Sequence, residues 1–424
     1  MRGYPPLSLA WLVWGLGATL YLIAFFQRVA PAVITRELSL DFNLTAAALG
    51  NLSAFYFYTY VAVQIPTGLA ADRWGPRRLL TAGALLTTIG TLVFAVAPTM
   101  AWASVGRLLV GAGSGVSFVS MLKLVTHWMP ARLFAFASGV ALVVGVVGAT
   151  IAGAPLRVGV DAFGWRPVMV GAAVVSAIAA IAIWWLVRDD PQERGYQSYY
   201  PAGASHGESA SIASQLRQVL SDRNPWLLFM IPGGLSGIVL SFAGLWGVPF
   251  LESQYGFTSR EAALIASGML LVWSFSTVAY GPLSQRIGRR KPIFIAGVAA
   301  AMALWSIVVF VPGLSRPVLL VTLAGISIAA GTFVLTFAWA KESVPARLSG
   351  SATGIANMGV MMGGMMQPLV GYVLDRHWDG RMANGVRVHD ITAWQSGFSL
   401  MLGWCALSLV LLLFARETYC KQLR

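Results

Sequence analysis

An arginine inside a long apolar segment is the first residue of this chain that could bind a ligand. Arg28 follows Phe25, Phe26 and Gln27 in an apolar run that covers positions 9–34. A cation at that depth in a bilayer is unfavourable unless it faces a partner or a water-filled cavity. Because a guanidinium can donate two parallel hydrogen bonds to a carboxylate or phosphate, Arg28 is a candidate anion-binding residue. The alternative is an arginine that reaches the membrane interface.

The next apolar segment carries polar and aromatic residues at helical spacing. Tyr56, Tyr60 and Gln64 recur every four residues, in line with Gly68 and Asp72, and therefore share one face of a helix. A glutamine facing lipid is unfavourable, so this face should line a cavity or a helix contact. We expect Tyr56, Tyr60 and Gln64 to contact the ligand, although core packing would explain the tyrosines equally well.

Three residues in other apolar segments are candidates for the same site. Lys123 lies near the end of the segment 101–127, where reaching the interface is an equal alternative. Trp246 and Asn357 lie in later segments, the second of them among glycines that allow helices to pack closely. For the tryptophan, packing is the alternative to ligand contact.

A charged loop with fixed glycines occurs twice in the chain. The pattern Gly68-x-x-x-Asp72-Arg73-x-Gly75-x-Arg77-Arg78 returns at residues 281–291, with Gln285 in place of the aspartate. Met129-Pro130-Ala131-Arg132-Leu133 returns at residues 344–348. Paired repeats between apolar runs indicate two homologous membrane halves.

The elements that must carry these residues are membrane helices. The chain is 57% hydrophobic and 11% charged, whereas about a quarter of the residues of a soluble domain are charged. Twelve apolar runs are long enough to cross a hydrocarbon core of about 30 Å: 9–34, 44–71, 79–97, 101–127, 134–156, 167–187, 225–250, 260–284, 292–312, 317–340, 350–374 and 394–415. We therefore expect an all-α polytopic membrane protein, whose first helix is not a cleaved signal peptide.

The distribution of Lys and Arg predicts the orientation in the membrane. The loops that follow the second, fourth, sixth, eighth and tenth runs, together with both ends of the chain, carry roughly twice as many as the opposite loops. Both termini are therefore expected in the cytoplasm. This asymmetry and attraction to anionic lipid explain the net charge of +13, so we expect no nucleic-acid partner.

The halves are expected to meet at one polar linker. We predict an amino-terminal six-helix bundle over residues 1–187, a cytoplasmic linker over 188–224 and a carboxy-terminal six-helix bundle over 225–424. Helical spacing of apolar residues predicts a short amphipathic helix on the membrane face of the linker: Ile212, Leu216, Val219 and Leu220. The bundles should be related by a pseudo-two-fold axis, as in transporters built from parallel repeats.

The glycine and charge pattern of the first loop closely resembles the signature loop of the major facilitator superfamily, and the resemblance covers the whole chain. It implies a secondary transporter in the bacterial inner membrane whose loop latches the two bundles together on the cytoplasmic side. The residues of that predicted conformational latch are Gly68, Asp72, Arg73, Gly75, Arg77 and Arg78. Because Gln285 lacks the charge of Asp72, the second copy should latch more weakly.

The sequence around Arg28 resembles the first helix of organophosphate antiporters and anion:cation symporters, where this arginine binds substrate. The resemblance implies alternating-access transport of a small organic anion or zwitterion. Fainter resemblance leaves open a dipeptide or amino-acid facilitator, and a transporter-like membrane sensor would need the same cavity.

Several site classes are not indicated. Cys405 and Cys420 form no metal-ligand pattern, and we expect no metal, no cofactor, no enzymatic activity and a monomer. No Asp or Glu falls in the middle of a predicted span. Proton-coupled carriers commonly use such an embedded acid, so facilitated transport or substrate exchange is the simplest expectation.

Overall fold

The computed structural model describes residues 3–200, 218–219, 222–345, 348–383 and 385–422. At six positions inside these ranges only the backbone is described: Ile65, Gly68, Leu69, Asp72, Ala131 and Ala135. The amphipathic helix predicted in the linker falls almost wholly outside the described residues, as do the positions Ala346 and Arg347 of the second repeat.

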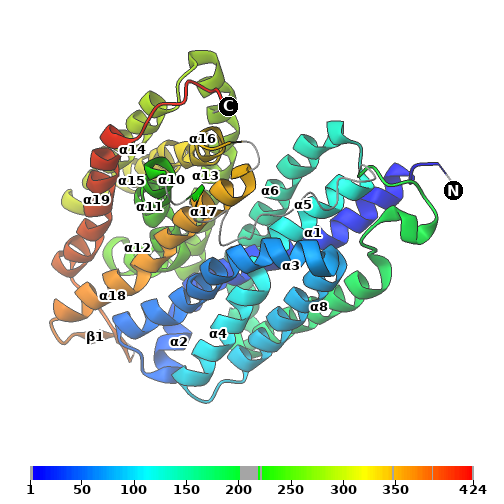
Figure 1. Ribbon diagram of the computed structural model, residues 1–424. Helices are drawn as coiled ribbons and strands as arrows, with labels where there is room; N and C mark the ends of the chain where they lie inside the picture. The colour runs from blue at the N-terminus through cyan, green and yellow to red at the C-terminus, as the bar shows by residue number, and fades with distance from the viewer. Residues whose placement is uncertain (1–2, 201–217, 220–221, 346–347, 384, 423–424) are drawn as a thin grey trace. The chain divides into compact units, whose positions relative to one another are not determined.

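Helices dominate the first half of the chain (Figure 1). Its elements are α1 (Leu7–Val33), α2 (Thr35–Phe42), α3 (Ala46–Ala95), α4 (Met100–Gly115), α5 (Ser117–Trp128), η1 (Ala131–Leu133), α6 (Phe134–Ile151), α7 (Ala154–Phe163), α8 (Trp165–Leu186) and η2 (Pro191–Arg194). One long helix, α3, covers two of the predicted spans. At Gly75 its backbone leaves helical geometry, with φ 80° and ψ 157°, which separates the two spans.

The second half is helical as well and includes one short hairpin. Its elements are α10 (Arg223–Met230), α11 (Pro232–Ile238), η3 (Val239–Trp246), α12 (Gly247–Tyr255), α13 (Ser259–Ile287), α14 (Lys291–Phe310), α15 (Arg316–Ala330), η4 (Gly331–Val334), α16 (Leu335–Glu342), α17 (Ser349–Met362), η6 (Gly363–Met365), α18 (Met366–Arg376), β1 (Met382–Ala383), β2 (Val386–Arg387) and α19 (Ile391–Phe414). The antiparallel strands β1 and β2 follow α18 (Figure 1).

The described helices agree with an all-α membrane protein. Ten helical segments in the described part of the chain are long and apolar enough to cross a bilayer. The predicted spans 44–71 and 350–374 are not among the ten, although both are helical, in α3 and in α17 to α18. The sequence did not predict α2, a short helix whose buried Thr35 and Leu38 occur among polar residues.

The contacts divide the chain into two compact units that cut across two helices. Unit 1 contains residues 1–28, 58–152 and 158–209, and unit 2 contains residues 29–57, 153–157 and 210–424. The last residues of α1 and the first residues of α3 therefore belong with the second half of the chain.

Each unit has its own apolar core. In unit 1 the core joins α1, α3, α5, α6 and α8, and Leu20, Leu124 and Trp128 are fully buried there. In unit 2 a group of aromatic rings packs in edge-to-face and tilted arrangements with centroid separations between 5.1 and 5.8 Å: Phe242, Phe250, Trp305, Trp394 and Phe398. Such contacts fix the helices that carry the candidate residues.

Candidate functional site

Arg28 is buried among aromatic rings in unit 1. Its side chain is on α1 and only 4% of the residue is exposed. The guanidinium carbon lies 4.3 Å from the centroid of Phe25 and 5.4 Å from that of Tyr60. Cation–π attraction compensates part of the desolvation of the cation. The planar N–H fork of a guanidinium has the geometry that suits a carboxylate, sulfonate or phosphate.

A second buried arginine fixes the backbone immediately before Arg28. Arg107, on α4, is 1% exposed and its Nη1 donates to the carbonyl of Gln27 at 2.7 Å. The amide Nε2 of Gln27 donates to Oγ1 of Thr91 at 2.9 Å. These bonds tie α1 to α4 and to the second half of α3. Gln27 was not among the residues predicted from the sequence, although it directly precedes the candidate cation Arg28.

The structure brings one member of the predicted tyrosine and glutamine stripe to Arg28. Tyr60 is buried and faces its guanidinium. Gln64 is half-buried, and its Nε2 donates to the carbonyl of Gly115 at 3.3 Å. Tyr56 is fully buried in unit 2, where it packs edge-on against Phe57 at 5.4 Å. Helical spacing predicted that these three residues share one face of the helix, but it could not predict which residue each side chain contacts.

The remaining three candidates lie on α5, η3 and α17. Lys123 is half-buried, and its Nζ donates at 2.7 Å to the carbonyl of Ala71, which immediately precedes Asp72. In unit 2, Trp246 is 2% exposed and donates from Nε1 to the carbonyl of Gln367 at 3.0 Å. Asn357 is half-buried on α17.

The first signature loop is held by an acidic residue that follows α8. The backbone N–H of Arg77 donates to Oδ1 of Asp189 at 2.6 Å. A Cβ on Gly75 would overlap that carboxylate, and the residue has a φ of +80° that favours glycine. Burial raises the pKa of Asp189, and the N–H of Arg77 opposes this effect. The side chain of Asp72 lies outside the described residues.

The neighbouring aspartate holds the end of α5. Nδ1 of His127 lies 2.8 Å from Oδ2 of Asp190, which also accepts a hydrogen bond from Ser198. Burial alone would raise the pKa of Asp190, but the hydrogen bonds from His127, the Gln192 amide and Ser198 lower it. The ring of His127 stacks on Tyr200 at 4.7 Å.

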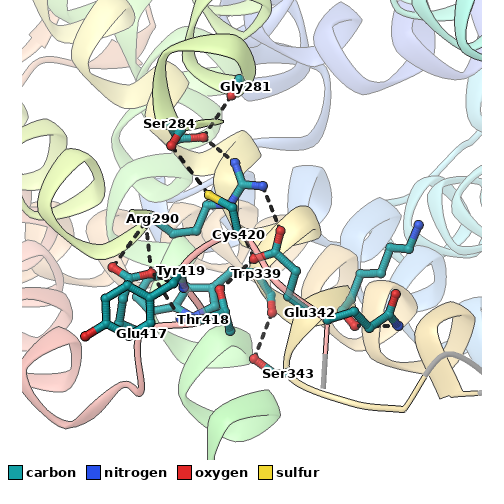
Figure 2. A network of polar contacts seen from close by, with 12 residues as sticks. Gly281, Ser284, Arg290, Trp339, Glu342, Ser343, Glu417, Thr418, Tyr419 and Cys420 are labelled. Carbon is teal, nitrogen blue, oxygen red and sulfur yellow. Dashed lines mark hydrogen bonds and ion pairs between the residues drawn. The ribbon is translucent and has the colours of Figure 1, made fainter. Parts of the chain in front are cut away.

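The second half contains a matching cluster at its own copy of the loop (Figure 2). The backbone N–H groups of Arg290 and Lys291 donate to the carboxylate of Glu417 at 2.8 to 3.1 Å. The Arg290 side chain, 4% exposed, pairs with Glu342 at 2.7 Å and also donates to Ser284. Burial alone would lower the pKa of Arg290, whereas Glu342 raises it.

The two clusters are copies of one arrangement. Arg188-Asp189 follows α8, and Arg416-Glu417 follows α19. Trp128 Nε1 donates to the carbonyl of Arg188 at 3.0 Å, and Trp339 Nε1 donates to that of Arg416 at 2.8 Å. In each half, a carboxylate after the last helix accepts hydrogen bonds from the backbone N–H groups at the start of the helical segment that follows the loop. This pairing extends the sequence repeat to residues 188–189, which were predicted in the linker, and 416–417, which were predicted in the carboxy-terminal bundle.

No set of three or more His, Cys, Asp or Glu side chains in the described ranges could hold a metal ion. Cys405 is buried and Cys420 is half-buried, and neither forms a disulfide.

The comparisons with known proteins agree with a membrane transporter. The family model of the Major Facilitator Superfamily matches residues 15–368 and, in a second match, residues 248–421. The chain is 25% identical over 384 residues to the probable sulfoacetate transporter SauU of Cupriavidus necator, covering 86% of this chain and 87% of that protein. It is 23% identical over 336 residues to the gentisate transporter of Corynebacterium glutamicum, covering 78% and 73%.

A solved structure has the same fold. The bacterial homologue of the human lysosomal transporter Spinster, in an inward-facing and occupied conformation, superposes with a TM-score of 0.76. The match covers 95% of this chain and 96% of that one at 18% identity.

Proposed function

This chain belongs to the Major Facilitator Superfamily and is an integral membrane transporter rather than an enzyme, and we propose that it moves a small organic anion by alternating access. The observation that carries the proposal is the buried guanidinium of Arg28 against Phe25 and Tyr60. The names of relatives support the substrate class, because sulfoacetate, L-galactonate and gentisate are all organic acids.

The proposed architecture is twelve membrane helices in two six-helix bundles related by pseudo-two-fold symmetry. The proposed boundaries are 1–187, 188–224 and 225–424. The repeated loop and the matched carboxylates Asp189 and Glu417 support this relation. The excess of Lys and Arg at both ends supports cytoplasmic termini in a bacterial inner membrane.

In this proposal Arg28 binds the anionic group of the substrate and Tyr60 orients the guanidinium. The fork geometry of arginine allows two parallel bonds to the oxygens of a carboxylate, sulfonate or phosphate ester. The rest of the proposed substrate contacts are the other predicted residues of the apolar segments: Tyr56, Gln64, Lys123, Trp246 and Asn357.

The proposed conformational latch is the first signature loop, with Asp72 as its charged member. The anchoring of Arg77 by Asp189 supports a fixed loop on which such a latch can act. The remaining proposed members are Gly68, Arg73, Gly75 and Arg78.

Ligand-induced thermal stabilisation and uptake into proteoliposomes test the substrate class. Purified protein is screened with sulfoacetate, aromatic and sugar carboxylates, phosphate esters and dipeptides. A ligand at 100 times its Kd should stabilise the protein by about 2.7 kcal/mol. Stabilisation by acids, with their uptake, would support the proposal. Stabilisation by dipeptides alone, or binding of acids without uptake, would contradict it in favour of a peptide carrier or a sensor.

A further inference from the structure

The amino terminus of α3 is capped by an aspartate from the other half of the chain. The backbone N–H of Ala46 donates to Oδ1 of Asp375 at 2.9 Å, and that of Ala47 donates to Oδ2 at 2.7 Å. Asp375 is on the last turn of α18, and all three residues belong to unit 2. The first N–H groups of a helix have no acceptor within it and form the positive end of its dipole. A carboxylate there is therefore favourable.

An arginine from the hairpin completes the contact. Nη1 of Arg387, on β2, lies 3.1 Å from Oδ1 of Asp375. The side chains are 30% and 17% exposed, respectively. Charge-assisted hydrogen bonds are shorter and roughly twice as strong as neutral ones, so this partly buried carboxylate makes three strong contacts.

Below the cap, α3 touches α17 and α18 at glycines. A Cβ on Gly50 would lie 2.5 Å from the carbonyl oxygen of Gln367, and one on Gly364 would lie 2.6 Å from the ring of Phe57. A Cβ on Gly371 would overlap the backbone of Ala46. These three glycines thus allow residues 46–57 of the first half to lie directly against α17 and α18 of the second half.

We propose that Asp375, with Ala46, Ala47 and Arg387, forms an outer latch that holds the extracellular ends of these helices closed and must break before the substrate site opens outward. The inference rests on the proposed alternating access and orientation. It extends that function, because the latch is assigned to a residue that neither the signature loop nor its second copy contains.

The two latches occupy opposite ends of the same predicted pair of spans. Asp72 directly follows the span 44–71, and Asp375 directly follows the span 350–374. The cap shows that the end of α18 meets the start of α3, so these segments run in opposite directions where they touch. One aspartate per span, at opposite membrane faces, can stabilise the two alternating states in turn.

Spin-label distances test the outer latch without a substrate. Labels are placed at Ser39→Cys on α2 and at Met382→Cys on β1, with Cys420→Ser in the background; Cys405 is fully buried. Asp375→Asn should increase the ratio of open to closed populations by about tenfold or more, as expected for loss of charge-assisted bonds. The rate of transport should change as well, because the open state becomes more populated than in the wild type.

Asp379→Asn is the matched control. It removes the same charge four residues further along the chain, in the loop after α18, but the contacts of Asp379 are with Arg381, whose side chain is 75% exposed. It should leave the distance distribution unchanged. Arg387→Gln is a second latch variant, and it should shift the distribution in the same direction as Asp375→Asn by a smaller factor. If Asp375→Asn does not fold, Arg387→Gln alone decides the result.

Equal distance distributions for wild type, Asp375→Asn and Arg387→Gln would overturn the outer latch. Equal shifts for Asp375→Asn and Asp379→Asn would also overturn it, because loop charge alone would then be responsible. The proposed substrate class fails independently if wild-type protein takes up no organic acid, since the distance measurement requires no transport.

Discussion

At the scale of single residues, the most informative feature is that Arg28 and Arg107 are both buried but serve different partners. Arg28 faces the rings of Phe25 and Tyr60, and Arg107 donates to the backbone carbonyl of Gln27. The backbone carbonyl of Gln27 accepts a hydrogen bond from Arg107 within the fold. Arg28 makes cation–π contacts with aromatic faces instead. We therefore predict that Arg107 has a structural role and that Arg28 binds the substrate anion.

Substitution of Arg28 by lysine should weaken anion binding although the charge is kept. Lysine is a point charge without the planar fork, so one of two parallel hydrogen bonds is lost and Kd should rise about tenfold or more. Titration of the stabilising acid against wild type and Arg28→Lys measures this. Arg36→Lys, at an exposed position, is the control. Unchanged affinity in both Arg28→Lys and Arg28→Ala would exclude Arg28 as the anion-binding group.

Substitution of Arg107 by leucine should reduce stability. The variant loses a buried hydrogen bond from a charged donor, a contribution of about 1.5–3 kcal/mol, and leaves the Gln27 carbonyl without that donor. Thermal unfolding in detergent would show a lower midpoint than wild type. Arg73→Leu, at an exposed position, should unfold like wild type. A wild-type midpoint for Arg107→Leu would show that the bond contributes nothing to the fold.

At the scale of elements, helix ends carry much of the specific chemistry outside the apolar cores. The helical segments that follow the two signature loops begin with backbone N–H groups that donate hydrogen bonds to a carboxylate. This carboxylate is Asp189 in one half and Glu417 in the other. Asp375 accepts hydrogen bonds in the same way from the first N–H groups of α3. Unsatisfied N–H groups at helix starts thus provide the sites where elements are tied together.

The loop before α19 should make stability depend on pH through His389. This histidine is 6% exposed, and burial lowers the pKa of its imidazole below the ordinary value of about 6.5. Three facing carboxylates partly oppose this shift, Asp375 on α18, Asp379 in the loop and Asp390 at the start of α19, whereas Arg387 on β2 lowers the pKa further. The folded protein therefore favours neutral His389.

The sign of the effect follows from the lowered pKa. Below about pH 6.5 the unfolded chain binds a proton that folded His389 does not, so the free energy of unfolding falls as pH decreases. Above that pH the contribution is fully present. The unfolding midpoint of wild type should decrease between pH 7.5 and 5.5 by more than that of His389→Gln. His377→Gln, at an exposed site, should keep the wild-type slope, and equal slopes for wild type and His389→Gln would contradict this account.

At the scale of the whole molecule, the positive site and the lack of acids in the middle of the predicted spans suggest how transport is coupled. A bound anion should stabilise a cation that is enclosed in a closed, low-dielectric site. The empty carrier should therefore change state slowly, and bound anion should accelerate the change. We expect facilitated transport or substrate exchange.

Counterflow in proteoliposomes tests this expectation. Preloading with unlabelled acid should increase the initial rate of labelled uptake several-fold over empty vesicles at equal pH inside and outside. A pH gradient alone should produce little accumulation. Strong accumulation driven by the gradient, with no effect of preloading, would instead identify a proton-coupled carrier and direct attention to Glu252, Glu342, Asp72 or His127.

The sequence alone predicted the membrane class, the helical fold, the repeated loops and the family. These follow from local properties: apolar length sets the span of a helix, and glycine and charge spacing set the loop. Arg28 and Tyr60 could be selected individually because polar groups in apolar runs are conspicuous. Their mutual approach could not, since it depends on how α1 packs against α3.

Only the tertiary structure decided which polar groups are partners. In that structure Lys123 donates to the carbonyl of Ala71, Trp246 donates to that of Gln367, and Asp375 accepts from the start of α3. Each pair joins segments far apart in the chain, and the acceptor or donor is often backbone, which every residue has. Because backbone partners leave no mark in residue type, the helices of this transporter can be predicted from its sequence, whereas the polar contacts between them depend on how the helices pack.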